Sequence, residues 1–442
     1  MSEKTSTSAG HIWNPEAESM PRGHLEEVQG SLLYEQVKHV YTNAPFFEAL
    51  YDDHGVQPSD IESTEDLQKL PTFTKDDLRD YRDRTGDFWC GTLCVPESQL
   101  EVANHSTGTT GKPNFYGLTE NDVDAVAETF ARQVYAWGLR RGDKINVHGK
   151  VLWHGYKHGF VQGCKKVGTV PILTAQDGHD IDDLFADLAE ADLDGVFVYS
   201  AEIEKEYADA NDIDPSEVFP NARIVCSAVD ASGPKIDLWE ELWDASFKNA
   251  YASGDQYWTT IPCDHDDQYY HVPEDQFIFE VLDPETREPV EPGEYGTLFI
   301  TNLRDEANPY VRYAMEDLVD YKVEPCECGR TTMRVRPLGR LSWCVDVVGR
   351  DQPVTSIEVE DVVWSDEELY GTNYQLVETS PGEQERLRVR VATEADVPPD
   401  TIEALETELQ DQFGVPSEVS IVGADAIGLE SDIKMERVTE EY

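Results

Sequence analysis

The sequence predicts an α/β protein with a large layered domain followed by a small α+β domain. Between about residues 100 and 335, short apolar runs alternate with stretches of helical periodicity, which is typical of α/β layering with largely parallel strands. A length of 442 residues fits two or three domains of about 150 residues each. Hydrophobic residues make up 39% of the chain and aromatic residues 10%, which provides for a sizeable core and argues against intrinsic disorder.

The individual elements follow from the local pattern. Residues 1 to about 100 are expected to form helices and loops, with helical periodicity over 25–41 and a helix start at 74–78. Strands are expected at the apolar runs 144–147, 170–173, 195–198, 223–226, 277–282 and 296–301, with a turn at Pro292-Gly293.

The pattern changes around Leu338-Gly339-Arg340. A strand, a helix at 356–363, a strand at 387–391, a helix at 399–413 and a polar end follow. We therefore expect two domains, 1–338 and 339–442.

The charge of the chain is unusual in its sign. There are 89 acidic against 35 basic residues, a formal net charge of −54, spread along the whole chain. Phosphate backbones and anionic lipids repel such a chain, so we expect no nucleic-acid or membrane partner. The even spread indicates adaptation to a salt-rich cytoplasm whose ions screen the self-repulsion; the alternative is an ordinary acidic protein. With no apolar signal region in residues 1–10 and no membrane-length apolar run, we expect a cytoplasmic protein.

A glycine-rich loop is the sharpest local feature. Its residues are Ser106, Thr107, Gly108, Thr109, Thr110, Gly111 and Lys112, followed by Pro113. Glycines let backbone N–H groups approach a ligand, and the hydroxyls and the lysine add donors, which suits a polyphosphate. It is not a Walker A loop, because Pro113 follows the lysine and Ser106 replaces the first glycine. The alternative is a plain surface turn.

This loop resembles the phosphate-binding motif of the adenylate-forming, AMP-producing ligases, and most closely that of their phenylacetate–CoA ligase branch. Four further motifs resemble that branch in the same order: residues 70–79, Arg312 to Leu318, Gly339-Arg340, and Lys434 to Val438. The resemblance implies the adenylate-forming ligase fold, with a large multi-layered N-terminal adenylation domain and a small mobile α+β C-terminal domain.

The resemblance also implies a reaction. An aryl or arylacetic acid would react with ATP and Mg²⁺ to give acyl-AMP and pyrophosphate, and the acyl group would pass to coenzyme A. Ser106 to Lys112 would cradle the pyrophosphate, Asp317 would bind the ribose hydroxyls, and Arg340 would contact phosphate or ribose. Lys434 would bridge the carboxylate and the α-phosphate. Ser227, Ala228 and Tyr251 fall in the other nucleotide-binding stretches.

Three departures from the branch pattern leave alternatives open. Asp255 stands where the branch has the glutamate that holds Mg²⁺, and its shorter side chain would bind through a water or not at all. The adenine-binding stretch reads Ser227-Ala228-Val229 instead of Gly-Ala-Glu. The hinge aspartates are missing from 339–344, and an arginine and an asparagine are missing from 348–352. The motifs for adenylation therefore match better than those for the CoA step.

A zinc site is expected from Cys326-x-Cys328 together with Cys263 and His271, because four Cys and His ligands suit tetrahedral zinc. The resemblance implies a structural zinc there. His265 competes with His271, and the alternative is free thiols with a surface histidine.

Trp153, Tyr156 and Phe160 are expected to stack on an aryl acid in the acyl pocket that the resemblance implies; the alternative is core packing. The branch also suggests a homodimer. Two other functions remain open: an adenylyltransferase that stops at the adenylate or adenylylates a deazaflavin cofactor, and a nucleotide-binding homologue without catalysis.

Overall fold

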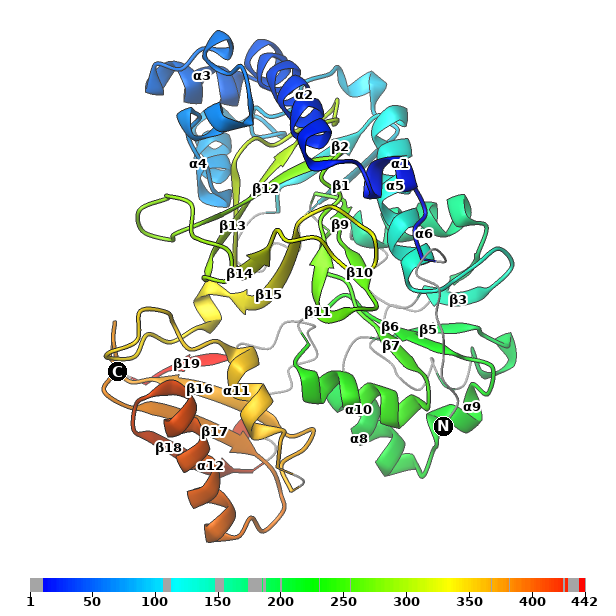
Figure 1. The fold of residues 1–442 in the computed structure, drawn as a ribbon, viewed down its shortest axis with the longest axis vertical. Helices are drawn as coiled ribbons and strands as arrows, with labels where there is room; N and C mark the ends of the chain where they lie inside the picture. Colours follow the sequence, from blue (N-terminus) through cyan, green and yellow to red (C-terminus); the bar gives the residue numbers. More distant parts are fainter. Residues whose placement is uncertain are drawn as a thin grey trace. The chain divides into compact units, whose positions relative to one another are not determined.

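Figure 1 shows the fold in a computed structural model of the chain. The structure describes residues 11–105, 113–147, 155–173, 185, 188–198, 201–229, 231–254, 256–366, 368–380, 382–423, 426–427 and 437–441. The chain divides into two compact units, one built from 1–177, 250–315 and 320–336, the other from 178–249, 316–319 and 337–442. Residues 178–249 thus group with 337–442, and the predicted domain division after residue 338 stays a prediction. None of the helices in the described ranges combines the length and apolar character needed to cross a bilayer.

The first unit begins with helices, as expected. They are α1 (Pro15–Glu18), α2 (Arg22–Asn43), α3 (Pro45–His54) and α4 (Lys75–Thr85). Helix α4 starts where the sequence predicts, because Thr74 and Asp77 form a capping box: each side chain accepts the backbone N–H of the other. Short 3-10 helices lie at Pro58–Asp60, Thr64–Lys69 and Glu97–Gln99.

The first unit also contains a parallel strand pair and two small antiparallel pairs. Strand β3 (Lys144–Val147) pairs in parallel with β4 (Val170–Leu173). Helices α5 (Glu120–Ala136) and α6 (Gly155–Val167) pack against each other. The antiparallel pairs are β1 (Val102–His105) with β2 (Phe115–Leu118), and β8 (Ala252–Ser253) with β9 (Trp258–Thr259).

The strands expected at 144–147 and 170–173, and those expected at 195–198 and 223–226, pair in parallel as predicted, whereas the six-stranded sheet corrects that expectation. Its order is β10 (Ile261–Cys263), β11 (Asp266–His271), β15 (Arg334–Arg340), β14 (Tyr313–Lys322), β13 (Gly296–Asn302) and β12 (Phe277–Leu282). The pairs β10–β11, β11–β15 and β12–β13 are antiparallel. The expected strands 277–282 and 296–301 exist, but only the turn-rich segment 283–295 joins them, so they form a hairpin.

The second unit contains a parallel sheet and a small mixed sheet. Strands β5 (Gly195–Phe197), β6 (Ile224–Cys226) and β7 (Ser246–Lys248) are parallel, with helices α8 (Ala201–Asn211), α9 (Pro215–Val218) and α10 (Gly233–Trp243) between them. The mixed sheet has the order β18 (Ser417–Val422), β17 (Leu387–Ala392), β16 (Asn373–Glu378) and β19 (Val438–Glu440). Helices α11 (Ser356–Val363) and α12 (Pro399–Phe413) pack on this sheet, at the predicted positions (Figure 1). Further 3-10 turns lie at Ala189–Ala191 and Leu341–Trp343.

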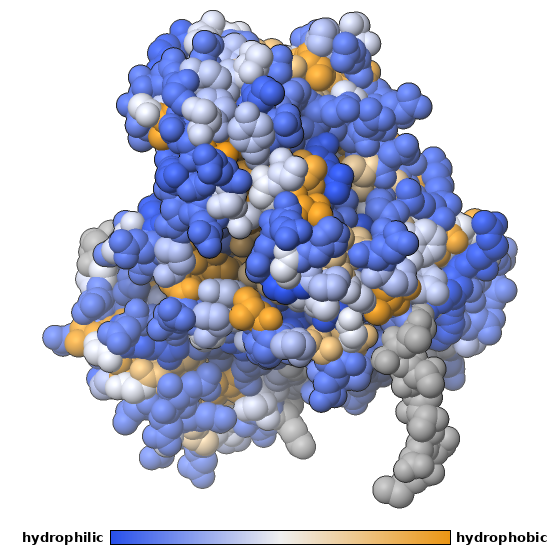
Figure 2. All heavy atoms as spheres, turned by 45° about the horizontal axis from the view of Figure 1, so that its top comes forward, coloured by the Kyte–Doolittle hydropathy of each residue, from blue (hydrophilic) through white to orange (hydrophobic). Residues whose placement is uncertain are grey.

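Many of the acidic side chains in the described ranges are exposed. Figure 2 shows a face dominated by hydrophilic side chains, with small apolar patches between them. Helix α12 illustrates the arrangement, because Leu405, Leu409 and Phe413 are buried while Glu403 and Glu408 are exposed. Charged side chains outside and apolar ones at helical spacing inside are typical of a folded globular domain.

Candidate active site and metal centre

Asp317 and Arg340 lie side by side on neighbouring strands. Asp317 is on β14 and Arg340 ends β15, and the Arg340 Nε atom is 3.8 Å from Oδ1 of Asp317. Gly339 has a φ of +104°, and a Cβ there would lie 3.3 Å from the Ser356 hydroxyl, so a glycine is needed just before Arg340. An accessible carboxylate beside a guanidinium can bind ribose hydroxyls and phosphate oxygens, respectively.

The stretch 227–229, which the resemblance predicts to bind adenine, is held by buried hydrogen bonds. The Ser227 side chain is fully buried and donates to the Val198 carbonyl at 2.8 Å. Ala228 follows it, half-buried. The Asn249 amide brackets the next residue, because its Nδ2 donates to the Val229 carbonyl at 2.8 Å and its Oδ1 accepts the Val229 N–H at 3.3 Å. The glutamate expected by resemblance at 229 is absent, but the backbone there is held from the end of β7.

Asn249 was missed by the sequence analysis. It directly follows the short strand β7, and polar residues at the carboxyl ends of parallel strands are the usual signal for a binding role. That signal was weak here because β7 has only three residues, Ser246–Lys248.

Tyr251 is buried and is fixed through its backbone. Its N–H donates to the Thr260 hydroxyl at 3.0 Å, and its carbonyl accepts the Thr260 N–H at 2.9 Å. Its ring meets the Trp258 ring edge to face at 5.1 Å. Asp255, the predicted Mg²⁺ ligand, lies outside the described residues.

The glycine-rich loop is bounded by an antiparallel hairpin. Strand β1 ends at His105 and β2 begins at Phe115, and these two residues are paired. Arg82 of α4 donates to the Pro113 carbonyl at 2.6 Å, just after the loop. The predicted residues Ser106 to Lys112, Trp153 and Lys434 lie outside the described residues.

Tyr156 and Phe160 lie on α6 and face α5. The two rings stack with centroids 6.1 Å apart, and the Tyr156 hydroxyl accepts from Gln133 of α5 at 2.7 Å. Phe160 also meets Trp137 at 5.6 Å. Core packing accounts for these contacts, and the predicted stacking on an aryl acid stays a prediction. On the same helix, burial lowers the pKa of the Lys157 ammonium to about 8.

A buried arginine joins two of the motifs quoted above. Arg312 makes a bidentate ion pair with Glu280, at 3.0 and 2.9 Å, and donates to the Leu70 carbonyl at 2.5 Å. Phe73 and Tyr313 form a parallel β-bridge beside it. The segment 70–79 and the start of β14 are therefore adjacent, although more than 200 residues separate them in sequence.

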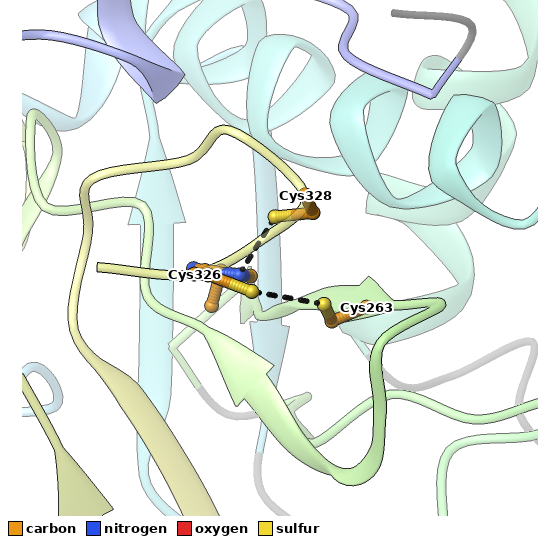
Figure 3. Close-up of side chains that lie close together, drawn as sticks. Cys263, Cys326 and Cys328 are labelled. Atoms are coloured by element: carbon orange, nitrogen blue, oxygen red, sulfur yellow. Dashed lines mark hydrogen bonds between the residues drawn. The ribbon is translucent and has the colours of Figure 1, made fainter. Parts of the chain in front are cut away.

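The four predicted zinc ligands come together in the first unit. Their ligand atoms all lie within 4.8 Å of one another. The Cys263 and Cys326 sulfurs are 3.5 Å apart, and the Cys328 sulfur is 3.3 Å from Nε2 of His271. Figure 3 shows the side chains of Cys263, Cys326 and Cys328 close together. Ligand atoms about 2.0 to 2.3 Å from a tetrahedral Zn²⁺ would be separated by similar distances. Nothing of this geometry was visible in a Cys-x-Cys pair alone.

The surroundings of the cluster favour a cation. His271 Nδ1 lies 3.1 Å from the Thr332 carbonyl, so its N–H can donate there and leave Nε2 free to ligate. The competing His265 points its ring to Glu327 at 3.7 Å, and it is not part of the cluster.

No family model matches the chain. Individual relatives do: the phenylacetate–coenzyme A ligase of Thermus thermophilus is 30% identical over 386 residues, covering 86% of this chain and 84% of the relative. The enzyme of the same name from Aromatoleum evansii is 27% identical over 450 residues and covers 96% of each chain.

Among solved structures, 2-hydroxyisobutyryl-CoA ligase in the postadenylation state with 2-HIB-AMP has a TM-score of 0.84 at 20% identity, covering 99% of this chain and 94% of that one. A likeness at this identity shows the fold, which confirms the predicted mixed α/β architecture of the adenylate-forming ligases. The sequence relationship to the Thermus enzyme shows the family as well. This chain belongs to the family of the phenylacetate–coenzyme A ligases.

Proposed function

We propose that this protein is an ATP-dependent, AMP-forming ligase that activates an aryl or arylacetic acid as its acyl adenylate and transfers the acyl group to coenzyme A. The observation that carries the proposal is the adjacency of Asp317, in the middle of β14, and Arg340, at the end of the neighbouring strand β15. The resemblance assigns both residues to nucleotide binding. Family membership supports it, because the relatives are named as phenylacetate–coenzyme A ligases.

The first half-reaction is an in-line displacement at the α-phosphate of ATP. The acid's carboxylate oxygen forms a bond to phosphorus, the bond to the bridging oxygen breaks, and pyrophosphate leaves. Asp317 accepts hydrogen bonds from the ribose hydroxyls, Arg340 neutralises phosphate charge, and Lys434 places a positive charge between the carboxylate and the α-phosphate. Asp255 would hold Mg²⁺ through a water, and the ion would supply further charge neutralisation.

In the second half-reaction the CoA thiolate attacks the acyl carbon, and AMP leaves. The chain departs most from its family in the segments that serve this step. The branch has its hinge aspartates at the positions of residues 342 and 343. In this chain, residues 341–343 form a 3-10 turn after Arg340. The Cys344 thiol lies 3.3 Å from the Arg340 carbonyl.

The deciding experiment measures acid-dependent pyrophosphate release in high potassium chloride with Mg-ATP. A panel of aryl, arylacetic and aliphatic acids is tested with and without CoA, and Lys434→Ala serves as the control. Release that depends on the acid and increases in turnover with CoA supports the ligase. Release that CoA does not stimulate points to adenylyl transfer instead, and ATP binding without release contradicts any catalytic role.

The Cys263, His271, Cys326 and Cys328 cluster is proposed to hold one structural Zn²⁺. The donor set fits, because four N and S ligands fill a tetrahedral site and leave no position for substrate. The acidic surface is proposed to be an adaptation to a salt-rich cytoplasm.

A further inference from the structure

We propose that Glu360 is a positioning residue for the adenylation step. Its carboxylate, shared by Lys235 and Arg437, anchors the C-terminal segment in which Lys434 lies. The inference rests on the proposed function, because it concerns the lysine that the adenylation chemistry needs.

The carboxylate of Glu360 is the centre of a buried ion cluster. Its Oε2 lies 3.0 Å from Nζ of Lys235 and 3.5 Å from Nη2 of Arg437, and only 2% of Glu360 is exposed. The Tyr374 hydroxyl lies 3.4 Å from the same oxygen. Buried charges are costly unless they are paired and hydrogen-bonded, so these four side chains constrain one another strongly.

Arg437 is also held by its own backbone and by an aromatic ring. Its guanidinium stacks over the Tyr374 ring at 4.3 Å and donates to the Tyr374 carbonyl at 3.3 Å. Its carbonyl accepts the Leu376 N–H at 2.8 Å, and the next residue, Val438, begins the parallel pairing of β19 with β16. Arg437 therefore lies where the chain enters the four-stranded mixed sheet of the second unit, immediately before β19.

Lys434 precedes this anchor by three residues. Three residues of extended chain span at most about 11 Å, so whatever holds Arg437 limits where the Lys434 side chain can reach. A misplacement of about 1 Å in a reacting group can cost about 100-fold in rate.

Lys235, the third charged residue of the cluster, connects Arg437 to the part of the second unit that contains the predicted adenine-binding stretch. It lies on α10, which runs between β6 and β7, the strands that precede Ser227 and Asn249. Two more contacts support the junction: the Gly233 N–H donates to Asp361 at 3.1 Å, and the Tyr370 hydroxyl donates to the Pro234 carbonyl at 3.1 Å. Glu360 thereby holds the segment that starts at Arg437 in a fixed position relative to β6 and β7, the strands that precede Ser227 and Asn249.

The test separates the two half-reactions of the full-length protein. Adenylation is measured as acid-dependent exchange of pyrophosphate into ATP, and thioester formation is measured with added acyl-AMP and CoA. Glu360→Gln is expected to lower exchange about 10- to 100-fold and to leave thioester formation within about twofold of wild type. Glu358→Gln, on the same helix and paired with Arg350 instead, is the matched control and should leave exchange unchanged.

A double variant shows whether Glu360 acts through Lys434. In the Lys434→Ala background, Glu360→Gln should cause no further loss of the residual exchange. The proposal would be overturned if the losses of exchange caused by Glu360→Gln and Lys434→Ala multiplied in the double variant. It would also be overturned if Glu360→Gln lowered both half-reactions equally and lowered the melting temperature.

A second variant covers the case in which Glu360→Gln does not fold. Lys235→Met leaves Glu360 paired with Arg437, so no buried carboxylate lacks a cation. It should lower exchange several-fold and spare thioester formation, whereas wild-type exchange would overturn the role of the cluster. If the wild-type protein catalyses neither half-reaction, the proposed function fails. This result is distinguishable from a failure of the Glu360 proposal, because it is obtained with the wild type before any variant is compared.

Discussion

The Arg340 guanidinium lies 3.8 Å from the Asp317 carboxylate, across the neighbouring strands β15 and β14. If the pair binds nucleotide, Asp317→Asn should raise the KM for ATP about tenfold or more, because charged hydrogen bonds contribute about 1.5–3 kcal/mol. Steady-state pyrophosphate release against ATP concentration measures this. Arg336→Gln is the control, since Arg336 pairs with Asp320 at 2.6 Å on the same two strands. An unchanged KM in Asp317→Asn would contradict the assignment.

Replacement of a single ligand should remove zinc from the metal cluster. We expect about one zinc per chain in the wild type and substantially less in Cys328→Ser, with a lower melting temperature, because a structural metal adds its binding free energy to folding. Elemental analysis and thermal unfolding, with and without a chelator, measure both. Cys344→Ser replaces a thiol outside the cluster and should change neither. A wild type purified with zinc available that holds none would end the zinc proposal.

The buried pair of Arg312 and Glu280 should matter for stability more than any surface pair. Arg312→Met leaves the Glu280 carboxylate buried without its cation, and we expect the free energy of unfolding to fall by about 3–5 kcal/mol. Urea denaturation measures it. The surface pair of Arg388 and Glu418 gives the comparison, because Arg388→Met should cost about 1 kcal/mol or less. Similar losses in the two variants would show that Arg312 is not an anchor.

Lys157 should make stability depend on pH. Burial lowers its pKa from the ordinary 10.5 to about 8, so between pH 8 and 10.5 the unfolded chain holds a proton that the folded chain has lost. The free energy of unfolding contributed by this group therefore rises with pH across that window, and its penalty is fully present below about pH 8.

Lys157→Met removes this penalty. The variant should be more stable than wild type at pH 7, and the difference should shrink as the pH rises from 8 to 10, as measured by urea midpoints. Lys165→Met, at an exposed position of the same helix, should give a small difference that does not change with pH. A pH-independent destabilisation in Lys157→Met would show that the ammonium contributes favourable contacts instead.

The net charge of −54 should make folding depend on salt. Raising potassium chloride from 0.1 to 1 M shortens the Debye length from about 10 to 3 Å and screens the self-repulsion, so the melting temperature should increase. A neutral osmolyte at equal osmolality separates screening from general solvent exclusion. A melting temperature that does not respond between these salt concentrations would contradict salt adaptation.

Local sequence patterns predicted the helices and strands better than they predicted which strands pair and in which direction. The apolar run of Phe277–Leu282 indicates a strand, but a strand buried on nearly every side chain looks the same in a parallel and an antiparallel sheet. The helix start at Thr74 and the C-terminal helices were predictable because caps and helical periodicity act within a few residues.

The candidate site was predictable where the sequence resembles a motif of the family, and the four metal ligands between residues 263 and 328 were predicted in the same way. Asp317 and Arg340 belong to short motifs, and the structure places them together. The resemblance already favoured His271 over His265, and the structure places His271 in the cluster on β11, which pairs with β15. Lys235, Glu360 and Arg437 are more than 70 residues apart in sequence, so their cluster exists only through tertiary packing.

The parallel pairing of β16 with β19 has a consequence for how the protein is made. Residues 379–437 separate the two strands, and at about 5–20 residues per second a ribosome needs roughly 3–12 seconds to translate them. During that time the nascent chain presents one edge of β16 with unpaired backbone groups, which another strand can bind. Strand β19 closes this edge only after residue 438 has been made, so a growing chain acquires the strands predicted to bind the nucleotide well before it acquires Lys434, the lysine predicted to act on it.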